Sequence, residues 1–141
     1  MREFRFMIPR GLDRNLTPNR SRFVHWSVVV NARDELKADA WLAAVDAKNR
    51  WAEENGHAWE MLEKAEISYK FFLPPRRQVM DDDNVIAGMK WVRDLLQENL
   101  LGIIKNDRDL VTAGVEWVRK SAFEGILVTV RERESDVQKV Q

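Results

Sequence analysis

Four consecutive side chains that could hold a cation stand in the middle of this chain: Asp81, Asp82, Asp83 and Asn84. Neighbouring carboxylates repel one another, so a cluster of them is costly unless a cation lies between them or solvent screens them. The cluster therefore suggests a divalent metal site. The alternative is a solvated start of a helix, because aspartates at a helix N-terminus cap it and complement its dipole. The acidic run alone leaves both interpretations open.

The rest of the chain limits which metal chemistry such a site could have. There is no cysteine, and two histidines are too few for a zinc site. A calcium loop of the EF-hand type is excluded because Val85 and Ile86 stand where it needs an oxygen ligand and a glycine. An all-oxygen site for Mg²⁺ remains, with Mn²⁺ as the alternative, and such a site suits metal-assisted phosphoryl chemistry.

Length and charge describe the chain around this cluster. With 141 residues the chain fits one domain. It has neither a stretch that could span a bilayer nor the apolar core of a signal peptide. We therefore expect a cytoplasmic protein that is not associated with membranes. The 23 basic and 23 acidic residues cancel. Residues 1–33 nevertheless hold seven arginines against two acidic residues. This basic segment either contacts phosphates or forms an ordinary solvated surface.

The first half of the chain predicts a strand, an irregular arm and a long helix. Residues 3–8 alternate as a strand does, and a basic arm over about residues 9–22 follows, broken by proline and glycine. Strand and helix compete over residues 23–30. Apolar residues at helical spacing predict a helix from Asp34 to Asn55 that stops at Gly56. We expect three tryptophans to pack in the core: Trp41, Trp51 and Trp59. His57 is expected to lie in a surface loop without a partner.

The second half predicts the elements that would carry the acidic cluster. Alternation from Glu66 to Leu73 indicates a half-buried strand that ends at two prolines. A helix then buries Val85, Met89, Val92, Leu96 and Leu100 and closes at Gly102. Residues 111–118 and 125–130 predict a hairpin, and a charged tail follows over about residues 132–141. The expected fold is a single α+β domain, a mixed β-sheet of about four strands with two main helices packed on it.

The order of these motifs is similar to that of a known family. An Asp-x-Asp-Asn motif within Asp81-Asp82-Asp83-Asn84 follows a strand and an Arg-rich turn, opens a Lys-bearing helix and precedes an Asn106-Asp107 turn. This order resembles the RusA-type Holliday-junction resolvases, including their phage-encoded relatives. The likeness extends to Thr17-Pro18-Asn19-Arg20, to His25-Trp26 and to the closing strand at residues 125–130, so it covers nearly the whole chain.

The resemblance implies a homodimeric, magnesium-dependent endonuclease that nicks two opposed strands of a four-way DNA junction symmetrically. Asp81 and Asp83 match the two motif aspartates and Asp107 matches the later acidic residue, so these three would be the catalytic metal ligands. Asp82 would be a spacer or a cap. The residues expected to contact DNA are Arg14, Asn19, Arg20, Arg22, His25, Arg76, Arg77, Asn84 and Arg93.

Two departures keep alternatives open. The family's catalytic lysine lies three residues after the motif asparagine, where this chain has Ala87. Lys90, seven residues after Asp83 and on the same helical face, is the expected substitute as a catalytic residue. Asp109 is an alternative third metal ligand. A non-catalytic DNA-junction binding module of the same fold and a protein-interaction domain whose acidic turn only caps a helix remain as alternative functions.

Overall fold

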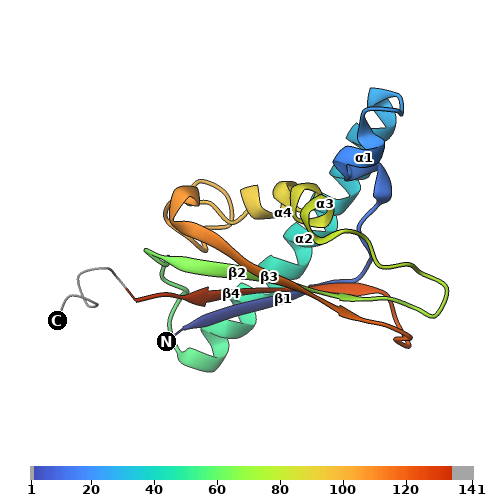
Figure 1. Ribbon diagram of the computed structural model, residues 1–141. Coiled ribbons are helices and arrows are strands. Elements are labelled where there is room, and N and C mark those ends of the chain that lie inside the picture. Colours follow the sequence, from blue (N-terminus) through green and yellow to red (C-terminus); the bar gives the residue numbers. More distant parts are fainter. Residues whose placement is uncertain (1, 135–141) are drawn as a thin grey trace.

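The computed structural model describes residues 2–134, which fold around a four-stranded mixed sheet in the order β1-β4-β2-β3 (Figure 1). β4 pairs antiparallel with both β1 and β2, whereas β2 pairs parallel with β3. The elements in chain order are β1 (Glu3–Ile8), η1 (Arg14–Leu16), α1 (Pro18–Ser21), α2 (Trp26–Asn55), β2 (Ala65–Phe72), α3 (Asp82–Gly88), α4 (Lys90–Asp94), η2 (Asp107–Asp109), β3 (Leu110–Val118) and β4 (Gly125–Glu132). The α+β class, the single domain and the mixed sheet of four strands are confirmed.

One face of the sheet forms the core. Alternate residues of β1, β2 and β4 are buried, as the period of two requires: Phe4, Phe6 and Ile8; Ala65, Ile67, Tyr69 and Phe71; Ile126, Val128 and Val130. α2 packs against β1 and contacts α4. The helical segment from α3 to α4 contributes Val85, Met89 and Val92, and the turn after α4 contributes Leu96, each fully buried; the helix ends at Asp94, before the predicted stop at Gly102. These four burials confirm the predicted stripe, except that Leu100 is 46% exposed because the chain has already turned after α4.

The predicted hairpin is wrong. β3 and β4 follow one another in sequence, but β4 lies between β1 and β2 and β3 is an edge strand beside β2. The core face of β4 is entirely apolar, and a central position with partners on both sides buries it. β3 instead has exposed residues such as Val111 and Glu116, which an edge position tolerates.

α2 is longer than predicted because it begins at Trp26 rather than Asp34. His25 caps it: the ring Nδ1 accepts a hydrogen bond from the Ser27 N–H at 3.1 Å. The competition over residues 23–30 is thus decided for helix from Trp26 onward. The predicted end is confirmed, since Gly56 adopts φ 76°, a left-handed conformation that glycine reaches without strain.

The predictions for the aromatic and terminal residues are partly confirmed. Trp59 is buried and its ring lies 4.9 Å from that of Trp51, but Trp41 is 38% exposed and is not a core residue. His57 is exposed as predicted, yet its ring contacts Trp51 at 5.0 Å. β4 continues to Glu132, and residues 135–141 of the predicted tail lie outside the described part of the chain. Within residues 2–134, no helix combines the length and apolar character needed to cross a membrane.

The basic arm folds back onto the helices. It contains η1 and the short α1 rather than a wholly irregular chain, and Leu12, Leu16 and Thr17 are buried. Leu12 approaches α3 so closely that a Cβ on Gly88 would meet its Cδ2 at 2.9 Å. A glycine at this position therefore lets the arm pack on α3, next to the acidic motif.

Candidate nuclease site at the start of α3

The arm and the first turn of α3 enclose a small surface hollow. The Asn84 side-chain Oδ1 accepts a hydrogen bond from the backbone N–H of Asn19 at 3.3 Å, which ties the two segments together. The residues that line the hollow are Arg14, Thr17, Asn19, Arg20, Val79, Met80, Asp81 and Asn84. Two cationic side chains of the arm and two members of the acidic motif thus face the same hollow, although more than sixty residues separate them in sequence.

The three neighbouring aspartates have different surroundings. Asp81 is the N-cap of α3, since its Oδ1 accepts a hydrogen bond from the Asp83 N–H at 3.3 Å. Asp82 accepts a hydrogen bond at 2.9 Å from the indole Nε1–H of Trp117, on β3. Asp83 is exposed, and in residues 2–134 no hydrogen bond or ion pair engages its carboxylate. The cap is therefore Asp81, and Asp82, predicted as spacer or cap, instead joins α3 to the sheet.

Asp107 lies at the other end of the helical segment. Arg93, in α4, donates from Nε to Asp107 Oδ1 at 3.1 Å and from a terminal nitrogen to the Asp107 carbonyl at 3.3 Å. The same guanidinium donates to the Thr112 hydroxyl at 3.1 Å and to the Leu110 carbonyl. Ten residues separate Asp83 from Arg93, which corresponds to about 15 Å along a helix. Arg93 thus holds the start of β3 against α4, and its expected contact with DNA stays a prediction.

The three predicted metal ligands are consequently not gathered in one chain. Among the described residues, no group of three acidic or histidine side chains is placed to hold a metal ion. Mg²⁺ commonly takes only one or two carboxylates together with substrate phosphates, so Asp81 and Asp83 fit this ion as a pair. Asp107 is paired with Arg93 at 3.1 Å, and its role as a third ligand stays a prediction. The alternative ligand Asp109 lies in the same 3₁₀ turn as Asp107 and faces Arg108 at 3.8 Å.

Lys90 is exposed at the first position of α4. Its Nζ lies 4.4 Å from the ring centroid of Trp91, which the guanidinium of Arg33 approaches at 5.3 Å. α3 and α4 are separated at Met89, but Val85, Met89 and Val92 are all buried, so the helical period is kept across this point. The expected face that carries Asp83, Ala87 and Lys90 therefore continues from α3 into α4. No contact in the described range links the ammonium to Asp81 or Asp83.

The remaining predicted DNA-contacting residues fall into two groups. Arg14, Arg20 and Arg22 are exposed and have no carboxylate partner within the described chain, and Arg76 is exposed as well. Arg77 pairs with Glu124 at 3.3 Å, and His25 uses Nδ1 to cap α2. Two residues to which the sequence interpretation gave no role in binding are the most exposed large apolar side chains of residues 2–134: Phe23 at 74% and Trp26 at 69%. Their position in an acid-free, arginine-rich stretch was the signal.

Tyr69 lies under this region, in the core face of β2. Burial raises the pKa of its hydroxyl above the ordinary value, and this outweighs the opposing effect of the neighbouring Arg93. Asp107 and Asp94 raise the pKa further. Tyr69, Arg93, Asp94 and Asp107 therefore form one electrostatic cluster at the junction of α4, β2 and β3.

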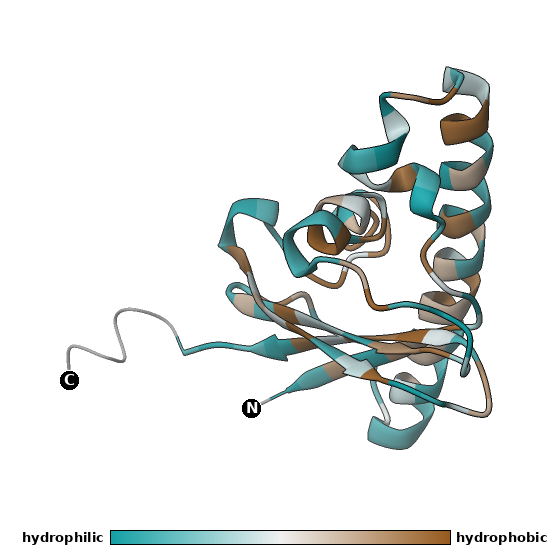
Figure 2. Ribbon diagram, turned by 45° about the vertical axis from the view of Figure 1, so that its right-hand side comes forward, coloured by the Kyte–Doolittle hydropathy of each residue, from teal (hydrophilic) through white to brown (hydrophobic). Residues whose placement is uncertain are grey.

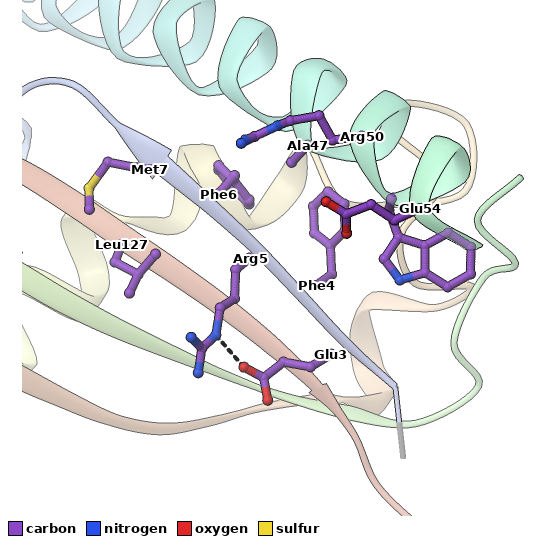
Figure 3. A pocket seen from close by; sticks show the side chains of 10 residues that line it. Glu3, Phe4, Arg5, Phe6, Met7, Ala47, Arg50, Glu54 and Leu127 are labelled. Atoms are coloured by element: carbon purple, nitrogen blue, oxygen red, sulfur yellow. Dashed lines mark hydrogen bonds and ion pairs between the residues drawn. The ribbon is translucent and has the colours of Figure 1, made fainter. Parts of the chain in front are cut away.

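A second hollow is larger but lacks converging chemistry. It lies between β1 and α2, with Glu3, Arg5, Arg50 and Glu54 at its rim and Phe4 and Phe6 toward the core (Figure 3). Arg5 pairs with Glu3 across its mouth. None of the predicted site residues lines it. It is an edge of the core between a strand and a helix.

A scan against protein-family models matched none of them, and a search of curated proteins found no match for the chain. The motif resemblance to the RusA type therefore stays a proposal.

Proposed function

We propose that this chain is a RusA-type endonuclease that depends on a divalent metal ion and resolves four-way DNA junctions by paired, symmetric phosphodiester hydrolysis. One observation carries the proposal: Arg14 and Arg20 of the basic arm line the same hollow as Asp81 and Asn84 of the acidic motif. A nuclease site needs carboxylates for a metal and cations for the backbone phosphates at one place. The hollow brings both kinds of group together.

The side chains divide the work as follows. Asp81 and Asp83 would hold Mg²⁺, or Mn²⁺ in its place. Bound metal would lower the pKa of a water and offset the charge of the scissile phosphate. Arg14 and Arg20 contact the phosphates beside that position. Asn84 keeps the arm in place through its hydrogen bond to the Asn19 N–H at 3.3 Å.

Lys90 supplies a positive charge for the cleaved phosphate in this proposal. Its side chain is exposed, and its Nζ rests on the Trp91 ring without an ion pair in the described residues. A long lysine on a flexible stem can turn toward a bound phosphate at little cost, because it has no ion pair to break and leaves only the Trp91 ring. The protein acts as a homodimer, since two copies related by a two-fold axis match the two-fold symmetry of paired incisions.

The deciding experiment uses a four-way junction labelled on each strand in turn. The protein is incubated with it in Mg²⁺ and in chelator, and linear duplexes of the same sequences serve as the control substrate. We expect symmetric nicks on two opposed strands that vanish in chelator. Equal cleavage of the duplexes would indicate a general nuclease, and the absence of nicks in either divalent ion would overturn the proposal.

A second candidate function is a junction-binding module without cleavage activity. Two observations favour it: Ala87 stands where the family has its catalytic lysine, and Arg93 occupies Asp107. This candidate predicts tight, structure-selective binding of the junction in chelator and the same binding, with no nicks, in Mg²⁺. The labelled junction therefore distinguishes the two functions in one assay.

A further inference from the structure

The most exposed aromatic rings of the chain stand at the outer end of the arm. Phe23 is 74% exposed and Trp26 is 69% exposed, on the turn between α1 and α2 and on the first residue of α2. α1 and the beginning of α2 project away from the sheet (Figure 1), and neither ring belongs to the core that contains Phe4, Tyr69 and Phe71. Figure 2 shows hydrophobic residues along this projecting part of α2. Two large rings in water need a partner to account for them.

The charge around the rings identifies the chemistry of that partner. Residues 14–33 contain four arginines, one histidine and no acidic residue. The guanidinium of Arg22 lies 4.9 Å from the ring centroid of Phe23, and the His25 ring lies 5.5 Å from that of Trp26. Elsewhere most described arginines pair with carboxylates, such as Arg10 with Glu35 and Asp39. The partner must therefore be anionic and must offer flat apolar faces.

We infer that Phe23 and Trp26 are a stacking platform for unpaired nucleotide bases, with Arg20 and Arg22 holding the adjoining phosphates. Aromatic rings set among unpaired cations are the usual means of binding single-stranded nucleic acid without sequence preference. The inference rests on the proposed function and deepens it. It specifies that the arm recognises interrupted base stacking, as at a branch point, and presents that DNA to the hollow that Arg20 and Asp81 share.

A second copy of this chain is the other partner that exposed rings could fit. In an isologous contact the same patch meets itself, so Arg14, Arg20 and Arg22 of both arms would come together. Like charges brought together across an interface cost free energy, and residues 14–33 contain no acidic side chain that could neutralise them. The charge pattern therefore favours DNA over self-association at this patch.

The test measures binding in chelator, so that it does not depend on cleavage. Fluorescein-labelled oligothymidylate, the four-way junction and a plain duplex are titrated with the wild type, Phe23→Ala, Trp26→Ala and Trp26→Phe. Trp41→Ala is the matched control, because Trp41 is also exposed on α2 but lies outside the acid-free stretch. Each alanine variant should bind oligothymidylate about tenfold more weakly, whereas Trp26→Phe keeps a ring and binds nearly as the wild type.

Salt dependence separates stacking from charge. The alanine variants should show the same slope of log affinity against log salt concentration as the wild type. Arg22→Gln should make this slope shallower by the amount expected for the loss of about one phosphate contact. Both rings are exposed, so the thermal midpoints should not change. The inference fails if Phe23→Ala and Trp26→Ala bind oligothymidylate as the wild type does, if the duplex is affected equally, or if sedimentation shows that the variants lose self-association instead of DNA binding. If DNA binding depends on the two rings but the junction is not nicked, the nuclease proposal is wrong and the stacking platform stands. If the junction is nicked but binding does not depend on the rings, the platform is wrong and the nuclease proposal stands.

Discussion

At the scale of single residues, neighbouring aspartates with the same charge have different partners. Asp81 caps α3, Asp82 bonds Trp117 of β3, and Asp83 has no partner in the described structure. A carboxylate already used by the fold can be replaced by an amide that keeps its acceptor oxygen. The structure gives the Asp83 carboxylate no such use, so a substitution there tests the proposed metal role without the loss of a contact.

Asp83→Asn and Asp82→Asn remove the same charge one residue apart. We expect Asp83→Asn to slow magnesium-dependent nicking by at least about 100-fold, because a neutral amide is a poor ligand for a hard cation. Asp82→Asn should cleave as the wild type does, since the amide oxygen can still accept the Trp117 hydrogen bond. Rates on the labelled junction provide the measurement. Equal activity of the two variants would leave the acidic run as a helix start only.

Lys90 and Ala87 test the position of the site's cation. Lys90→Ala should lower the nicking rate by about 100-fold while binding of the junction in chelator is unchanged, because the charge acts on the transition state. Ala87→Lys, added to Lys90→Ala, should restore part of the rate by placing the ammonium where the RusA type has it. If Lys90→Ala cleaves normally, another cation performs this role, and Arg76 is the next exposed candidate.

At the scale of elements, Arg93 joins α4 to the start of β3. Its guanidinium contacts Asp107, Leu110 and Thr112, three residues that flank the η2–β3 junction. The side chain is only 23% exposed, so these acceptors have limited access to water when Arg93 is removed. The pairing of Arg93 with Asp107 thus has a structural purpose that its sequence position did not indicate.

Arg93→Met should lower the free energy of unfolding by about 2 kcal/mol, because partly buried acceptors lose a charged donor. Arg108→Met is the control: Arg108 is 80% exposed and its pair with Asp109 is long, so its loss should change stability by less than about 0.5 kcal/mol. Urea denaturation midpoints compare the variants. Equal effects would mean that the Arg93 contacts add no stability.

Tyr69 is the chain's one tyrosine, so its ionisation can be followed directly. In the unfolded chain it loses its proton at about pH 10, whereas burial raises its pKa in the folded protein. Above about pH 10 the unfolded state binds fewer protons, so stability falls as pH rises, and below that pH the contribution is constant. Tyrosinate absorbance should appear only as the protein unfolds. Tyr69→Phe should lose this part of the alkaline dependence; an early, reversible titration in the folded wild type would contradict the prediction.

At the scale of the whole molecule, a chain of zero net charge concentrates unpaired arginines in its arm. The arm packs on α3 through Leu12 and Gly88, so Arg14 and Arg20 share a hollow with Asp81. A dimer would present two such surfaces to a four-armed substrate. Neutral total charge then does not prevent DNA binding, because binding depends on the local patch within a Debye length rather than on the sum.

Mixed dimers test the two-site arrangement. When wild type is refolded with excess Asp83→Asn, most wild-type subunits should pair with an inactive partner, and the junction should receive single nicks in place of paired ones. Sedimentation should show twice the chain mass for each protein alone. Paired nicks that decline only in amount, with no single nicks, would mean that one subunit makes both cuts.

The sequence alone determined what depends on neighbours along the chain. The strands at β1 and β2, the stop at Gly56 and the buried stripe from Val85 to Leu96 follow from periods of two and 3.6 and from the backbone freedom of glycine. The acidic motif and its place at the start of a helix were also local features. Each of these expectations agreed with the structure because burial of one face acts on residues a few positions apart.

The tertiary structure decided what depends on distant partners. It placed β4 between β1 and β2, because a strand with an apolar core face is more stable when it pairs with a neighbour on each side. This preference does not depend on the order of the strands in the chain. It separated Asp107 from Asp83 by pairing it with Arg93, and it brought Arg20 to Asp81 through the packing of the arm on α3. Sequence spacing carries no information on such contacts, because side chains far apart in sequence meet only once the core has folded.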